Sequence, residues 1–147
     1  MTVAVLAVSY QILLAALGNS LAWSIAQTAG SAMRKTQLPA DLPVTSIPFV
    51  DRICSNDLRL GGADLAAGDV VLVYLGGFDA GPTGSRADHF GTGPHICVGK
   101  ALAESAWRSL AAMLSGLDRR ICLKQVAYRD LDYTLVSPRR ILAEVLP

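Results

Sequence analysis

The chain carries little charge, and its first 33 residues contain no charged side chain at all. Charged residues make up 17% of its 147 residues, the formal net charge is +1, and Lys and Arg form no long runs. Proteins that bind nucleic acid or an anionic membrane surface usually present a strongly basic patch. The composition therefore predicts neither nucleic acid nor a charged membrane surface as a partner.

Cysteines are few and widely spaced. The three of them, Cys54, Cys97 and Cys122, cannot all pair with one another, and none lies in a Cys-x-x-Cys arrangement. Disulfide frameworks and structural zinc sites usually show even numbers of cysteines or closely spaced pairs. We expect neither, and a reducing, cytoplasmic location fits this cysteine usage best.

The uncharged N-terminal stretch raises the question of a membrane anchor over residues 3–29. A spanning helix needs about 20 predominantly apolar residues, and a signal peptide begins with a basic region. No basic residue precedes this segment, and polar residues interrupt it, namely Ser9, Gln11, Asn19, Ser20, Ser24, Gln27 and Thr28. The pattern favours a buried helix and leaves a membrane anchor as the alternative.

Abundant apolar residues predict a single ordered domain over residues 1–147, because 52% of the chain is hydrophobic and can form a sizeable core. Residues 1–35 form a predicted helical segment. In it, apolar side chains recur on nearly all sides from Ala4 to about Ala29, so we expect this helix to be buried. A cluster of prolines then predicts a loop over residues 36–51.

A hairpin and a long loop are predicted in the next part of the chain. The β-branched run at residues 70–75 pairs most simply with the preceding strand near residues 57–60. Glycine and proline then dominate residues 76–94, which favours turns over regular structure.

A second helix is predicted over residues 98–117, with Leu102 and Leu110 on its apolar face. Trp23 and Trp107 fall on the two helices and are expected to fill core space. Short strands follow near residues 121–124, 133–136 and 141–146. Together these elements predict a mixed α+β fold that is mainly helical.

Residues 90–99 read Phe-Gly-Thr-Gly-Pro-His-Ile-Cys-Val-Gly and stand directly before the second helix. A cysteine at this place meets free N–H groups and the positive end of the helix dipole, which favour its thiolate form. Glycines at 91, 93 and 99 allow tight turns and a close approach of the backbone to a flat macrocycle. The residues alone leave open that Cys97 is a small buried apolar side chain beside a glycine-rich turn.

The same ten residues resemble the haem-binding pattern of the cytochrome P450 family, Phe-x-x-Gly-x-His/Arg-x-Cys-x-Gly. The matching residues are Phe90, Gly93, His95, Cys97 and Gly99. Residues 52–71 resemble the hairpin that precedes this loop in the family, and residues 100–104 resemble the start of the helix that follows it. The resemblance extends from about Arg52 to Leu117.

This resemblance implies a partial cytochrome P450 fold and a haem-thiolate site. The Cys97 thiolate is expected to bind the iron of haem b, with Arg52 and His95 on the haem propionates and Phe90 over the sulfur. The expected cofactor-binding residues are therefore Arg52, Phe90, Gly91, Gly93, His95 and Gly99, with Cys97 as the metal ligand. The family also implies a monooxygenase that oxidises a small organic substrate with electrons from a ferredoxin or a reductase.

Several family features are missing from this chain. The family's Glu-x-x-Arg motif should precede Arg52, but both glutamates, Glu104 and Glu144, follow it, and Ser-Ala-Met-Arg at residues 31–34 occupies the expected place. Residues 17–21 weakly match the long helix on the distal haem face, and residues 9–13 then replace the family's proton-delivering groups. The chain is also much shorter than a complete member, so we expect oxygen activation to be impaired.

A non-enzymatic function is the alternative interpretation. On this view, the chain is a truncated remnant or an interaction module that binds no haem. It would cover its exposed apolar face by self-association or with a partner chain. A third interpretation combines a membrane anchor at residues 3–29 with a small haem-binding domain.

Overall fold

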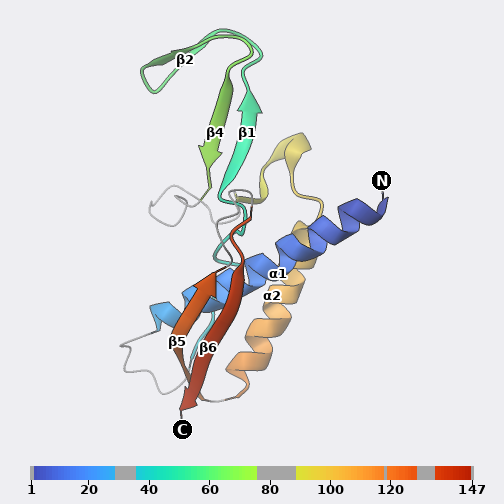
Figure 1. Ribbon diagram of the computed structural model, residues 1–147. Coiled ribbons are helices and arrows are strands. Elements are labelled where there is room, and N and C mark those ends of the chain that lie inside the picture. The colour runs from blue at the N-terminus through green and yellow to red at the C-terminus, as the bar shows by residue number, and fades with distance from the viewer. Residues whose placement is uncertain (1, 29–35, 76–88, 118, 129–134, 147) are drawn as a thin grey trace.

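The computed structural model describes residues 2–28, 36–75, 89–117, 119–128 and 135–146. These residues form α1 (Thr2–Gln27), β1 (Phe49–Ile53), β2 (Leu58–Leu60), β3 (Ala63–Leu65), β4 (Val70–Tyr74), the 3-10 turn η3 (Gly93–His95), α2 (Lys100–Ser115), β5 (Arg120–Tyr128) and β6 (Pro138–Leu146). Helix α1 crosses α2 and also contacts the β5–β6 hairpin, while the β1–β4 ribbon projects away from this body (Figure 1).

Helix α1 confirms the predicted N-terminal helix but not its burial on all sides. Between Tyr10 and Thr28, one side is buried and includes Ala15, Ala16 and Ile25, whereas Tyr10 and Leu14 are 62% and 49% exposed. Apolar residues around the whole helix do not indicate which side has a neighbour, and here α2 and the β5–β6 hairpin cover one side. Within the described part of the chain, no helix is both long and apolar enough to cross a membrane.

The core lies where α1 crosses α2 and centres on Trp107, which is fully buried, as predicted for this tryptophan. Ala103 and Ala111, one turn before and after Trp107, are buried with it, and its indole N–H donates to the Pro39 carbonyl at 2.9 Å. The predicted apolar face is correct only in part, because Leu110 packs against this core whereas Leu102 is 65% exposed. The small alanine side chains beside Trp107 leave room for α1, and leucines of both helices, Leu13, Leu17, Leu21 and Leu110, pack around the tryptophan.

The pairing predicted for residues 70–75 is also wrong. Strand β4 pairs antiparallel with β1, from Phe49 opposite Tyr74 to Ile53 opposite Val70, and β2 pairs with β3 in a separate small hairpin. The β1–β4 ladder continues past Ile53, since the Cys54 N–H donates to the Asp69 carbonyl at 2.9 Å. Strand propensity identified β4 but not its partner, because the first three residues of β1 lay in the segment predicted as the proline-rich loop.

That proline-rich loop, predicted over residues 36–51, ends at Pro48, because Phe49–Asp51 belong to β1. Two serines fasten it. The Ser20 hydroxyl on α1 donates to the Val44 carbonyl at 3.0 Å and accepts from the Val44 N–H at 3.2 Å, and the Ser46 hydroxyl donates to the Ile12 carbonyl at 3.1 Å. We call residues 36–48 the proline loop.

The C-terminal strands are longer than predicted, since β5 and β6 have nine residues each and form one antiparallel hairpin. Strand β6 begins at Pro138, so Leu135 and Val136 precede it, and the other half of the strand predicted at 133–136 lies outside the described residues. A hydrogen bond and the negative charge of Glu144 raise the pKa of Lys124, which forms an ion pair with it across the hairpin. With these strands, the fold is mixed α+β, as predicted, and α1 and α2 together still contain more residues than the strands.

Candidate functional site

The loop that carries Cys97 is closed by backbone hydrogen bonds at the entrance to α2. The Cys97 N–H donates to the Phe90 carbonyl at 2.7 Å, so the two ends of the loop lie together. The Cys97 carbonyl accepts from the Lys100 N–H at 3.1 Å, and the Gly99 carbonyl accepts the first helical bond from Ala103 at 2.9 Å. Cys97 is exposed, so its sulfur can be reached from outside at the positive end of α2.

The three glycines of the loop have different surroundings. Gly91 has φ +75°, and a Cβ there would lie 2.8 Å from the His95 carbonyl oxygen. Gly93 has φ +60° with open space around it. Gly99 has φ −85°, which any residue adopts, and its Cβ would meet the Cys97 sulfur at an ordinary 3.7 Å. The positive φ angles agree with a tight turn at Gly91 and Gly93, the backbone at Gly99 does not itself require glycine, and the close approach of these glycines to a macrocycle stays a prediction.

Phe90 anchors the loop to the helical core. It is half-buried and packs against the cluster around Trp107. The centroids of the His89 and Phe90 rings lie 4.4 Å apart. The Lys100 ammonium lies over the face of the Phe90 ring, 5.8 Å from its centroid, in a cation–π contact. The expected position of Phe90 over the Cys97 sulfur stays a prediction.

The surroundings of Cys97 fit a haem better than a bare metal ion. Among the described residues, no group of three His, Cys, Asp or Glu side chains gathers to hold an ion, so iron at Cys97 would need other donors, which a macrocycle supplies. Ile96 and Val98 on either side of Cys97 are 47% and 103% exposed. Apolar side chains beside a reachable thiol suit a flat apolar group lying over them.

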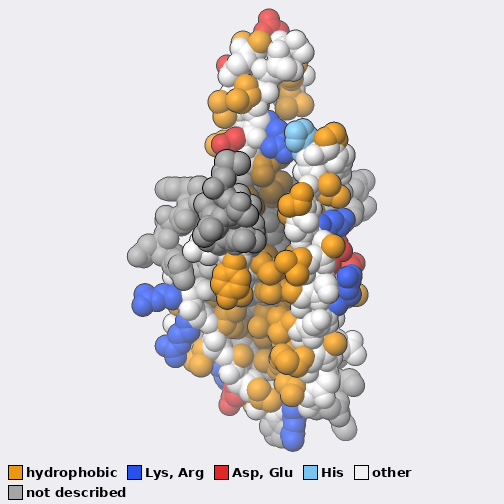
Figure 2. Space-filling model, turned by 90° about the vertical axis from the view of Figure 1, so that its right-hand side faces the viewer, with side chains coloured by type: hydrophobic (Ala, Val, Ile, Leu, Met, Phe, Trp, Pro, Cys, Tyr) orange, Lys and Arg blue, Asp and Glu red, His pale blue; other side chains and the backbone are white. Residues whose placement is uncertain are grey.

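The two predicted propionate-binding residues lie on separate elements. Arg52 is an exposed residue of β1, and its guanidinium donates to the Asp51 carbonyl at 2.7 Å. His95 is exposed at the end of η3, where its backbone N–H donates to the Thr92 carbonyl at 3.3 Å. The loop lies beside the base of the β1–β4 ribbon (Figure 1), and cationic and histidine side chains gather there (Figure 2). Their roles toward a propionate stay predictions.

Other positions singled out in the sequence are divided between core and undescribed parts. Cys54 is buried and Cys122 half-buried, and both are free thiols. The segment at residues 31–34, expected in place of the Glu-x-x-Arg motif, lies outside the described residues.

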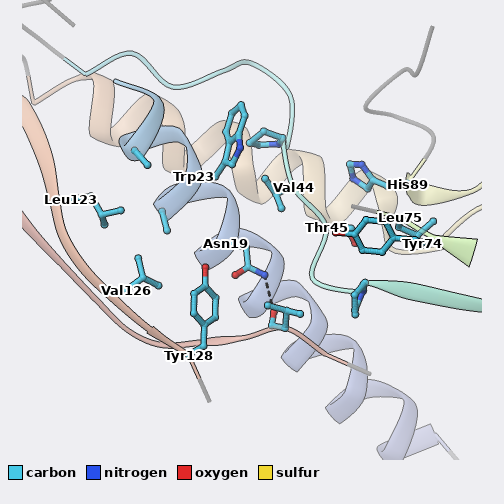
Figure 3. A pocket seen from close by; sticks show the side chains of 15 residues that line it. Asn19, Trp23, Val44, Thr45, Tyr74, Leu75, His89, Leu123, Val126 and Tyr128 are labelled. Atoms are coloured by element: carbon cyan, nitrogen blue, oxygen red, sulfur yellow. Dashed lines mark hydrogen bonds between the residues drawn. The ribbon is translucent and has the colours of Figure 1, made fainter. Parts of the chain in front are cut away.

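A hollow of about 380 Å³ lies between α1, the proline loop and β5 (Figure 3). Asn19 and Trp23 of α1, Tyr128 of β5 and His89 are among the residues that line it. Sequence reasoning assigned Trp23 to the core and treated Asn19 only as a polar interruption of an apolar helix. An asparagine within an apolar helix is the sequence signal that could have indicated this hollow, because a buried polar side chain needs hydrogen-bond partners.

No protein-family model matches the chain, but two curated proteins are similar to part of it. Linalool 8-monooxygenase of Pseudomonas putida is 36% identical over 94 residues, which cover 54% of this chain and 23% of that protein. The 2-hydroxy-5-methyl-1-naphthoate 7-hydroxylase of Streptomyces carzinostaticus is 32% identical over 84 residues, which cover 48% of this chain and 20% of that protein. Each match therefore spans less than a quarter of the relative.

Solved structures of cytochrome P450s resemble the fold over most of this chain. A versatile cytochrome P450 enzyme of Bacillus subtilis superposes with a TM-score of 0.66 and 16% identity, over 91% of this chain and 42% of that structure. P450 RauA, complexed with a biosynthetic intermediate of aurachin RE, superposes with a TM-score of 0.60 and 22% identity, over 94% and 37%. At these identities the likeness concerns the fold alone.

Proposed function

The chain is a relative of the cytochrome P450 family that corresponds to part of its members' length, and on this premise we propose that it binds haem b through the Cys97 thiolate. The observation that carries the proposal is the position of Cys97. Its thiol is exposed at the entrance to α2, on a loop closed by the bond from Cys97 to Phe90 and flanked by exposed Ile96 and Val98. A single soft sulfur donor of this kind suits iron held in a macrocycle.

The other loop residues position the cofactor. Arg52 and His95 provide cationic or hydrogen-bonding groups for the two propionates, and their exposure leaves them accessible to such anions. Phe90 fixes the loop against the core, and its proposed role is to limit the access of water to the sulfur side once haem is bound. When bound, the haem supplies iron chemistry with dioxygen, and the thiolate sets the electronic properties of the iron.

The wider function proposed is that of a monooxygenase-like protein acting on a small organic substrate, with electrons from a ferredoxin or reductase. The names of the curated relatives, a monooxygenase and a hydroxylase, support this reaction class. Turnover is impaired in this proposal because the polar side chains of α1 either face solvent or bind backbone groups and so do not deliver protons to bound dioxygen. Tyr10 and Gln11 are exposed, and both Asn19 and Ser20 hold backbone groups of other segments.

The spectrum of the reduced protein with carbon monoxide tests the proposal. The purified chain, reconstituted with haemin and reduced, is expected to show the long-wavelength Soret band of thiolate-ligated haem. The Cys97→Ala variant is expected to lose that band, while Cys122→Ala, which removes a half-buried thiol on β5, retains it. Failure to take up haem, or an unchanged band in Cys97→Ala, would contradict the proposal.

The same reconstitution measures the contribution of Arg52. Replacement by Leu is expected to weaken haem affinity about two- to tenfold, since an exposed ion pair contributes modestly. Arg59→Leu is the matched control, because Arg59 is also exposed on a strand and pairs with Asp64 at 3.6 Å. Equal affinities in the two variants would exclude Arg52 from the site.

A second candidate function is an interaction module that associates without haem. The observation that favours it is the exposed apolar surface of α2 and the loop before it, where Val98, Leu102 and Met113 are 103%, 65% and 62% exposed. Hydrophobic side chains gather over the helical body in Figure 2. Such a surface is typical of a protein that associates with another chain or with its own copy.

A further inference from the structure

Lys100 stands at the end of α2 where a cation is least favourable. It is the first residue of the helix, and the first turn contains no acidic residue. The N-terminal end of a helix carries the positive end of the helix dipole, which repels a cation. Glu104, one turn further on, pairs with Lys100, but the lysine then precedes the glutamate, which is the weaker of the two orders on a helix. The stability of the helix therefore does not account for a lysine at this position.

The side chain of Lys100 lies against the loop that carries Cys97. Its Nζ is over the face of the Phe90 ring, 5.8 Å from the centroid, and 3.8 Å from Oε1 of Glu104. Only 30% of the side chain is exposed. The Phe90 ring packs against the core around Trp107, so it offers the ammonium a fixed aromatic face, which attracts a cation.

Phe90 and Lys100 are also the two residues that bond the backbone of Cys97. The Cys97 N–H donates to the Phe90 carbonyl at 2.7 Å, and the Lys100 N–H donates to the Cys97 carbonyl at 3.1 Å. The contact between the ammonium and the ring therefore joins the two backbone partners of Cys97 to each other. The cysteine backbone is held between two residues that bind one another, while its side chain stays exposed.

We propose that Lys100 is a positioning residue of the Cys97 loop, whose ammonium on the Phe90 ring keeps the loop closed and so fixes the cysteine for the haem iron. This inference rests on the proposed haem site and adds to it a residue that acts through Phe90 and needs no contact with haem. The contact with the ring offsets the unfavourable place of the cation at the start of α2. A loop that is closed before the cofactor arrives loses less conformational freedom on binding.

The chain without haem tests the closure of the loop. Lys100→Gln removes the charge and keeps a good helix-forming residue, and the amide hydrogen of Cys97 is expected to exchange about two- to fivefold faster, as loss of a partly exposed cation–π contact gives. Lys100→Arg restores a cation over the ring and is expected to restore the slow exchange. Lys124→Gln, at a lysine paired across the β5–β6 hairpin, is the control. The indole N–H of Trp107 in the core is expected to exchange at one rate in all four proteins, measured by NMR.

Haem titration then tests the positioning. Lys100→Gln is expected to weaken haem affinity about two- to fivefold, and Lys100→Arg to retain it. In a chain that already carries Phe90→Leu, Lys100→Gln is expected to have no further effect, because the ammonium has lost its ring. Absence of haem uptake by the unaltered chain would contradict the proposed function, and the exchange rates would still decide whether Lys100 closes the loop.

Four results overturn the role of Lys100. They are unchanged Cys97 exchange in Lys100→Gln, no recovery in Lys100→Arg, an equal change at the Trp107 indole, and additive effects of Lys100→Gln and Phe90→Leu on haem affinity. The third would mean that the lysine stabilises the whole chain rather than the loop.

Discussion

Gly91 and Gly93 both have left-handed backbone conformations in the Cys97 loop, yet only one of them is crowded. At Gly91 an added Cβ would lie 2.8 Å from a backbone oxygen, which cannot move aside as the end of a flexible side chain does. At Gly93 the same Cβ would find nothing within 4 Å. Gly91 therefore lets the backbone at residue 91 lie close to the His95 carbonyl, whereas Gly93 only provides a turn.

This difference predicts unequal effects of alanine at the two glycines. Gly93→Ala is expected to lower the free energy of unfolding by about 1 kcal/mol, the cost of a left-handed alanine. Gly91→Ala is expected to cost about 2–3 kcal/mol and to weaken haem uptake, because the collision with the His95 carbonyl adds to the strain. Urea denaturation measures the first effect, and haem titration measures the second. Equal losses in both variants would contradict the assigned crowding.

The sequence motif predicted a loop with tight turns directly before the second helix, and the structure has such a loop between Phe90 and Gly99, while the roles of its residues toward haem stay predictions. The motif lies within one short loop, from Phe90 to Gly99, and a short loop can adopt few backbone conformations. Gly99 needs no special backbone conformation, because its conformation follows from the start of α2 and not from the loop. The contact of Asn19 could not be predicted from the motif, because its partner, Val136, lies far away in the sequence.

Among the elements, α1 has the largest part in holding the fold together. Ser20, in its C-terminal third, is fully buried and bonds both the carbonyl and the N–H of Val44 in the proline loop. Gly18, two residues earlier, packs against β6, where an added Cβ would lie 2.8 Å from Pro138 Cγ. The small residues of α1 thus bring a loop and a strand against one side of the helix.

Ser20→Ala is expected to destabilise the protein by about 1–3 kcal/mol, because both backbone groups of Val44 would lose their partner in a buried place. Ser105→Ala, at an exposed position on α2, should change stability by less than about 0.5 kcal/mol. Thermal and urea unfolding of the two variants measure the difference. If Ser20→Ala behaved like Ser105→Ala, the proline loop would not depend on this contact.

Elements with strong local signals were predicted, while their partners were not. Apolar periodicity and β-branched runs gave α1, α2 and β4, because each depends on neighbouring residues. The pairing of β4 with β1 rather than with β2 depends on contacts between segments separated in the sequence. The buried side of α2 was predicted only at Trp107 and Leu110, since the alanines around Trp107 become a core face only when α1 packs against them.

For the molecule as a whole, the main feature is the apolar surface that remains outside the core. Leu102 and Met113 lie about three helical turns apart on the same side of α2, opposite to the contact with α1, and both are more than half exposed. The match to the curated relatives covers less than a quarter of the length of each of them. In a purified sample, the partner available to this surface is a second copy of the chain.

The isolated chain is therefore expected to dimerise through this side of α2. Leu102→Gln combined with Met113→Gln keeps good helix-forming residues while removing the apolar area, so the dimer dissociation constant should rise roughly tenfold or more. Arg108→Gln, an exposed change elsewhere on α2, is the control and should leave it unchanged. Sedimentation over a concentration series, with and without haem, measures the constant. A chain that stays monomeric at every concentration, or a double variant that dimerises like the control, would show that the exposed surface is not a self-association site.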